Sequence, residues 1–215
     1  MRNTDSIEPI RRFLVRSAGI LCVAPASVLS SILTAATGFA QKNAGPERIL
    51  LRVSQIRQET NLCVPTSAAM VMKYFGEERS PRELKTLSRG QVYDPRAKFT
   101  DFTITFFKDL IKGISGLGYR WVEKRHENDD RGFDDGLRDI INDLKNNNPV
   151  LVDTSYFKGH TFVIAGGDTA AQKLFIVDPN IPSPGVRRLT FQEFKPVWNT
   201  PGTGSRFLIS TSRKS

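Results

Sequence analysis

The sequence predicts an α+β domain in which a helical first half precedes a sheet-forming second half. Three segments of the first half carry apolar residues at helical spacing, namely 64–75, 104–114 and 133–146. Beyond Pro149 the pattern changes to short apolar runs rich in β-branched residues, namely 150–152, 161–165 and 174–177. Helices followed by a meandering antiparallel sheet are typical of the α+β class.

The first elements surround a cysteine. Ile49–Val53 is a candidate strand that leads into a helix of about three turns. Pro65 suits the first turn of this helix, where no backbone donor is needed, and Gly76 stands where a helix usually stops. Residues 80–83, Ser-Pro-Arg-Glu, predict a capping box ahead of a short helix that ends near Gly90.

The middle of the chain alternates turns with helices. Residues 93–100 are rich in turn formers, and the apolar stripe of 104–114 predicts a helix that ends at Gly116. Tyr119–Val122 is a candidate strand, and the charged segment Glu123–Gly132 is predicted to be a loop. An amphipathic helix is expected over Phe133–Asn146.

The second half supplies the sheet. Gly-Gly-Asp and Asp-Pro turns separate its three apolar runs, as in an antiparallel meander. Gly185–Phe191 and Arg206–Ser210 are further candidate strands.

Composition and charge describe an ordinary globular protein. The chain has 215 residues, 39% of them hydrophobic, and a net charge of +9. Its Lys and Arg residues are scattered, without a basic run or a nucleic-acid motif, so no nucleic-acid partner is predicted. Neither a cluster of metal ligands nor a phosphate-binding Gly loop is present, so no cofactor is predicted.

Residues 1–40 resemble an export signal. Arg11 and Arg12 precede an uncharged stretch from Ser17 to Gln41, and small residues permit cleavage after Ala40. The arginine pair resembles a bacterial twin-arginine signal. We therefore expect an exported protein, periplasmic or secreted, in which 41–48 is a linker and 49–215 the functional domain. The alternative is an uncleaved signal that anchors the chain in the membrane.

Cys63 is the candidate nucleophile. It lies at the start of the first helix, where unpaired N–H groups and the helix dipole favour the reactive thiolate. Gln58, five residues earlier, can place a side-chain amide nearby, and Gln55 competes for that role. Loss of the signal would remove Cys22 and leave one unpaired thiol, which is a liability in an oxidising compartment unless it is used. The alternative is a buried structural cysteine.

His160 and Asp178 are the candidate base and its orienting acid. His160 opens one predicted strand and Asp178 closes the next, so an antiparallel turn should bring them together. Asn180 competes with Asp178 for the third position. The other histidine, His126, lies in the charged segment and is expected to be solvated.

Three motifs together resemble a known family. Cys-Val-Pro-Thr-Ser-Ala-Ala-Met (63–70), Gly-His-Thr-Phe-Val-Ile-Ala-Gly (159–166) and Phe-Ile-Val-Asp-Pro (175–179) are similar to motifs of peptidase family C-thirty-nine and its stand-alone relatives. The parent family supplies the peptidase domain of bacteriocin-exporting ABC transporters. The resemblance implies a papain-like fold, with Cys63 as nucleophile, His160 as base, Asp178 as orienter and Gln58 as oxyanion donor.

Two hypotheses about function follow. The first is an exported cysteine peptidase that cleaves peptide or amide bonds of a peptide or protein substrate through an acyl-enzyme, with peptidoglycan cross-links or group transfer as variants of the same chemistry. The second is a non-catalytic peptide- or envelope-binding protein that retains the papain-like fold. Membrane contact is expected only through the export signal, and the sequence predicts no oligomeric state.

Overall fold

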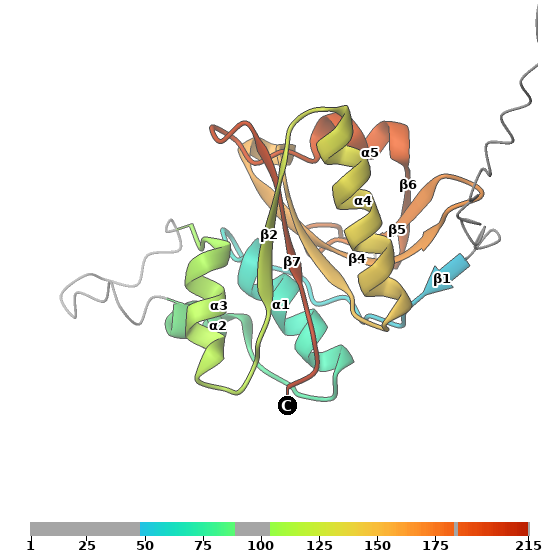
Figure 1. Cartoon of the computed structure of the whole chain (residues 1–215). Helices are drawn as coiled ribbons and strands as arrows, with labels where there is room; N and C mark the ends of the chain where they lie inside the picture. Colours follow the sequence, from blue (N-terminus) through green and yellow to red (C-terminus); the bar gives the residue numbers. More distant parts are fainter. Residues whose placement is uncertain (1–47, 89–103, 183–184, 215) are drawn as a thin grey trace, which may run out of the picture. The chain divides into compact units, whose positions relative to one another are not determined.

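The computed structural model describes residues 48–88, 104–182 and 185–214, which form five α-helices and one seven-stranded antiparallel sheet (Figure 1). The strands are β1 (Arg48–Leu50), β2 (Val122–Glu127), β3 (Val150–Thr154), β4 (His160–Asp168), β5 (Lys173–Val177), β6 (Arg187–Thr190) and β7 (Ser205–Ser210). The helices are α1 (Cys63–Tyr74), α2 (Pro81–Ser88), α3 (Phe107–Ser115), α4 (Asp130–Lys145) and α5 (Phe191–Val197), with a 3-10 turn at Tyr156–Lys158.

The sheet has the strand order β2-β7-β3-β4-β5-β6. The expected meander of β3, β4 and β5 is confirmed, with each strand antiparallel to the next. β1 pairs with the last three residues of β4, and β7 lies between β2 and β3. The C-terminal strand therefore connects the charged strand β2 to the rest of the sheet.

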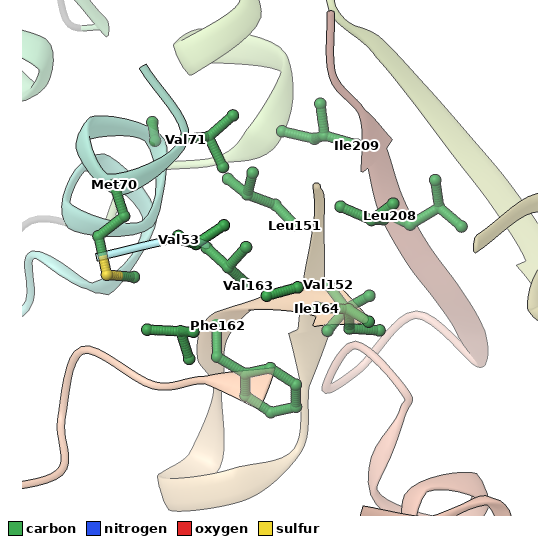
Figure 2. Packing of buried hydrophobic residues seen from close by; sticks show 14 of the residues in the cluster. Val53, Met70, Val71, Leu151, Val152, Phe162, Val163, Ile164, Leu208 and Ile209 are labelled. Atoms are coloured by element: carbon green, nitrogen blue, oxygen red, sulfur yellow. The ribbon is translucent and has the colours of Figure 1, made fainter. Parts of the chain in front are cut away.

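Helices cover both faces of the central strands. Leu151 pairs with Val163 and Ile209, and Figure 2 shows these side chains on the side of Met70 and Val71 from α1. Their neighbours along the strands point the other way. On that face the ring of Phe162 lies 6.5 Å from the ring of Phe194 in α5. Burial on both faces explains why β3 and β4 are continuous apolar runs rather than alternating ones.

α1 is the helix that fixes the position of Cys63. All of its residues from Val64 to Met72 are buried, including the polar Thr66 and Ser67, so other parts of the domain surround it on all sides. Gly76 lies in the turn after the helix and has a φ of 94°, a conformation that glycine adopts without strain. The predicted start and end of this helix are confirmed.

The predicted loop at Glu123–Gly132 and the predicted strand at Tyr119–Val122 are wrong. Val122–Glu127 is strand β2, and α4 begins at Asp130, with the Asp129 side chain accepting from the N–H of Gly132 at 2.7 Å. Among the described strands β2 pairs only with β7, and it is exposed along most of its length, which explains why it tolerates charged residues. His126 on this strand is not solvated as expected, because its ring is 14% exposed and lies 3.2 Å from Asp139.

Three smaller predictions also need correction. The candidate strand Gly185–Phe191 is the shorter β6, and Phe191 already belongs to α5, which the sequence did not predict. Ile104 lies outside α3 and is 73% exposed, so it is not part of the apolar stripe. The first strand ends at Leu50 rather than at Val53.

The expected export signal at 1–40, nearly all of the linker at 41–48 and the turn-rich segment 93–100 lie outside the described residues. Within the described ranges, no helix is long and apolar enough to cross a membrane. These ranges all belong to one compact unit.

Candidate active site

Cys63 is the first residue of α1. The preceding residue, Leu62, provides no side-chain cap, and its carbonyl accepts from Thr66 N–H at 2.8 Å. Pro65 has no N–H, so the donors left at this helix end are those of Cys63 and Val64, for which no acceptor is found in the described part of the chain. The thiol is partly exposed. A partly exposed sulfur can attack a substrate, and the free backbone N–H groups beside it can donate hydrogen bonds to the oxyanion that the attack forms.

His160 and Asp178 lie side by side, as the antiparallel arrangement of their strands predicted. His160 is the first residue of β4, Asp178 follows β5, and His160 Nε2 donates to Asp178 Oδ1 at 2.8 Å. The two residues are only 3% and 5% exposed. With Nε2 engaged by the carboxylate, Nδ1 is the nitrogen that remains for Cys63. Cys63 lines the same cleft as His160, and its interaction with the imidazole contributes to the raised pKa of His160.

The electrostatics of these three residues favour a protonated imidazole. Burial lowers the pKa of His160, but the hydrogen bonds with Asp178 and Cys63 outweigh burial and raise the pKa to about 9. Burial raises the pKa of Asp178, but the hydrogen bonds from His160 and from Asn180 N–H outweigh it and hold that pKa below its usual range. At neutral pH the site therefore contains an imidazolium next to a carboxylate.

Asn180 is not at the imidazole. Its side chain is exposed, and its backbone N–H donates to Asp178 Oδ1 at 2.8 Å. The asparagine therefore contributes to the site through its backbone, as part of the turn that orients the carboxylate of Asp178.

The two glutamines have different surroundings. The Gln55 amide nitrogen donates to the carbonyls of Asp178 at 2.7 Å and Ile181 at 2.9 Å, and its oxygen accepts from Gly185 N–H at 3.2 Å. Gln55 is thus occupied in holding the turn after β5. Gln58 instead has a buried side-chain oxygen without a partner among the described residues. Its backbone N–H donates to Pro179 O at 2.9 Å, which ties it to the same turn.

A cleft of about 330 Å³ opens beside the thiol and the imidazole. It lies between the N-terminal ends of α1 and α3 and residues of the strands β2, β3, β4 and β7. Its walls include Asn61, Cys63, Val64, Ile104, Thr105, Phe106, Phe107, Lys108, Glu123, Asp153, Lys158, Gly159, His160, Thr161, Thr200, Pro201, Thr203 and Phe207. The apolar lining and the few polar groups are typical of a ligand-binding cleft.

Asp153 is a site residue that the sequence analysis missed. It lies on β3 opposite Thr161, the residue after His160. Burial raises the pKa of Asp153 to about 6, although the hydroxyl of Thr200 and the N–H of Thr154 partly offset it. The signal in the sequence was a carboxylate that directly follows the buried run Val150–Val152.

Phe157 was missed as well. It precedes His160 by three residues, has a φ of 53° and is 76% exposed. Its ring meets the imidazole edge-on, with 5.7 Å between centroids. Lys158 and Gly159 also have positive φ, so three consecutive residues in unusual conformations lead into β4.

His126 lies outside this cleft. In the ranges described, no group of three or more His, Cys, Asp or Glu residues could hold a metal ion.

Comparisons with known proteins concern the family and the fold of the chain. A family model described as Peptidase_C39 like family matches residues 50–205. The peptidase domain of Streptococcus ComA, a bi-functional ABC transporter involved in a quorum sensing pathway, is 22% identical with a TM-score of 0.52, over 74% of this chain and 98% of that chain. A double glycine motif protease from an AMS/PCAT transporter, in complex with the leader peptide, is 15% identical with a TM-score of 0.47, over 77% and 99%. No curated protein matches. The likeness to ComA shows that the fold is the α+β, papain-like fold expected from the sequence.

Proposed function

The chain belongs to the C39-like peptidase family, and on this premise we propose that it hydrolyses peptide or amide bonds through Cys63, His160 and Asp178. The observation that supports the proposal is the buried hydrogen bond of 2.8 Å between Asp178 and His160, which lines the same cleft as Cys63. A nucleophile, a base and an orienting acid in this order are the groups that covalent acyl transfer requires.

Acylation begins with the thiolate of Cys63. Its sulfur attacks the carbonyl carbon of the scissile bond and forms a tetrahedral intermediate. The oxyanion accepts hydrogen bonds from the Cys63 N–H and from the side-chain amide of Gln58. The His160 imidazolium then gives its Nδ1 proton to the leaving amine, the C–N bond breaks, and a thioester remains on Cys63.

Deacylation uses the same groups. Neutral His160 takes a proton from a water molecule, the resulting hydroxide equivalent attacks the thioester, and the second tetrahedral intermediate releases the carboxylic acid. The thiolate–imidazolium pair is restored. Asp178 stays ionised throughout and stabilises the imidazolium, because its pKa is held below the usual range.

A peptide library tests the proposal. Protein that begins near Gln41 should cleave members of an internally quenched fluorescent peptide library, and Cys63→Ala and His160→Ala should each abolish cleavage. A thiol-directed electrophile should form one adduct, at Cys63. If the electrophile reacts slowly and no library peptide is cleaved, the chain is a non-catalytic binding protein with a peptidase fold.

We also propose that the protein is exported. The arginine pair Arg11-Arg12 and the small residues before Gln41 support this, and so does the single thiol that would remain after cleavage.

A further inference from the structure

We infer that the cleft contains a cation-selective pocket, in which Asp153 binds the ammonium or guanidinium group of a substrate side chain next to the scissile bond. The inference rests on the proposed function, because it assumes that Cys63 attacks a peptide lying in this cleft. It adds the chemical class of one substrate residue, namely a basic side chain such as lysine.

The first support is the position of Asp153. It lines the same cleft as Cys63 and His160, and its strand neighbour Thr161 is wholly buried, with a hydroxyl that helps to lower the pKa of Asp153. The hydroxyl of Thr200, also in the cleft wall, is buried and interacts with the Asp153 carboxylate. The carboxylate of Asp153 is thus held by neighbouring hydroxyls in the wall of the cleft that contains the thiol.

The second support is the charge of Asp153. No ion pair to this carboxylate is found among the described residues. Burial raises its pKa to about 6, and the neighbouring hydroxyls and the charge of His160 offset burial only in part, so it is mainly ionised at neutral pH. An unpaired carboxylate in a partly desolvated position is unfavourable, and a cation from a ligand would remove most of that penalty. A neutral ligand would leave that free-energy penalty in place.

The third support is the shape of the lining. Val64, Phe107, Pro201 and Phe207 give the cleft apolar walls, while the carboxylate of Asp153 supplies the charge. Lysine and arginine have the complementary form, with an apolar stem that packs against such walls and a charged end.

Other charged groups face the pocket and bear on its pH dependence. His160 and the Cys63 thiol lie on the side of the reaction centre, and Glu123 reaches the cleft from β2. Lys108 and Lys158 line the rim, and both are exposed, so their ammonium groups remain in water. The attraction between Lys108 and Glu123 lowers the pKa of Glu123, but burial outweighs it and raises that pKa. Asp153 is therefore the carboxylate that a cation deep in the cleft would meet.

The test uses two thiol reagents of similar size and different charge. The Cys63 thiolate attacks the sulfenyl sulfur of 2-aminoethyl methanethiosulfonate, a cation, or of propyl methanethiosulfonate, which is neutral, and expels methanesulfinate in both cases. The ratio of the two second-order rate constants measures the local preference for a cation and cancels changes in thiolate reactivity. Asp153→Asn should lower this ratio by about five- to tenfold. In the unsubstituted protein the ratio should rise as the pH increases through about 6, where Asp153 ionises.

Glu127→Gln is the matched control. It removes one negative charge from an exposed position on β2 outside the cleft, and should change the ratio by less than twofold. Thr161→Val tests the same pocket without removing the charge, and should leave the ratio high. If Asp153→Asn leaves the ratio unchanged while thermal unfolding shows the variant to be folded, the pocket is not cation-selective and the inference is wrong.

A second measurement concerns substrate. In quenched peptides that differ only by lysine or norleucine at each position flanking the cleavage site, one lysine peptide should have a lower KM, and Asp153→Asn should remove that advantage with a smaller effect on kcat. The thiol reagents need no peptidase activity. A protein that cleaves nothing but shows the Asp153-dependent ratio would refute the proposed function alone. A protein that cleaves norleucine and lysine peptides equally would refute this inference alone.

Discussion

His160 has a pKa of about 9 because two hydrogen bonds outweigh its burial. The usual value for histidine is about 6.5, so the folded state binds the proton more tightly than the unfolded chain. The resulting stabilisation is fully present below about pH 6.5 and is lost as the pH rises through 9. The imidazolium that the proposed mechanism needs therefore persists through the whole neutral range.

A proton NMR titration of the histidine rings tests this value. The chain has two histidines, and His126→Asn identifies the signal of His160. The His160 signal should titrate near pH 9. Asp178→Ala removes one of the bonds that raise the pKa, so the midpoint should move to lower pH. A midpoint near 6.5 in the unsubstituted protein would mean that the ring does not form these hydrogen bonds.

Asp178 and Asn180 should differ sharply as substitutions. Asp178→Ala removes the carboxylate that accepts from His160 Nε2 and should lower kcat by about two orders of magnitude or more, with the circular dichroism spectrum unchanged. Asn180→Ala keeps the backbone N–H that contacts Asp178 and should retain most of the activity. The reverse result would assign the asparagine as the orienting residue.

Gln58 and Gln55 offer a second contrast. Gln58→Ala should lower kcat by about two to three orders of magnitude, as loss of one oxyanion donor does, and leave the melting temperature nearly unchanged. Gln55→Ala should mainly lower the melting temperature, because it removes three hydrogen bonds that hold the turn after β5. Equal losses of kcat without loss of stability would show that the two roles are not separate.

At the scale of elements, α4 depends on a close approach at Gly136. A Cβ there would lie 2.4 Å from the indole of Trp198, which is wholly buried. Gly136→Ala should therefore destabilise the protein by about 1–3 kcal/mol, despite the better helix propensity of alanine. Urea unfolding measures the change. Asn142→Ala, at an exposed position of the same helix, should not lower the free energy of unfolding. A stable Gly136→Ala protein would mean that α4 can shift away from the sheet.

The elements that the sequence predicted well are those whose burial imposes a simple period. β3, β4 and β5 are buried on both faces, and α1, α3 and α4 carry their apolar residues at helical spacing. β2 was missed because an edge strand of charged residues has no apolar period, and only its pairing with β7 defines it. α5 did have a signal, since Thr190 and Glu193 form a capping box, but the strand-like residues before it obscured the signal.

At the scale of the whole molecule, the proposed reacting groups could be predicted but the cleft could not. Cys63, His160 and Asp178 each lie at the end of an element, and antiparallel pairing of neighbouring strands brings the last two together. Asp153 joins them only through the register that places it opposite Thr161, and the cleft walls come from stretches spread between Asn61 and Phe207. Such long-range juxtaposition leaves no local pattern.

The expected compartment also belongs to this scale. If residues 1–40 are an export signal, protein isolated from the envelope of its host should begin near Gln41, and Edman sequencing of that protein would show it. Arg11→Lys with Arg12→Lys should retain the precursor in the cytoplasm, because twin-arginine export depends on the arginine pair. A protein that starts at Met1 and remains in the cytoplasm would exclude export.

The place of β7 within the sheet has a consequence for how the protein is made. β7 joins β2 to β3, yet a ribosome produces it after all the other strands. At about 5–20 residues per second, the chain grows for on the order of ten seconds between Cys63 and the last strand. During that time β2 has no partner, and Phe207 is missing from the cleft wall. The nascent chain therefore carries the Cys63 thiol on the order of ten seconds before its cleft can be complete.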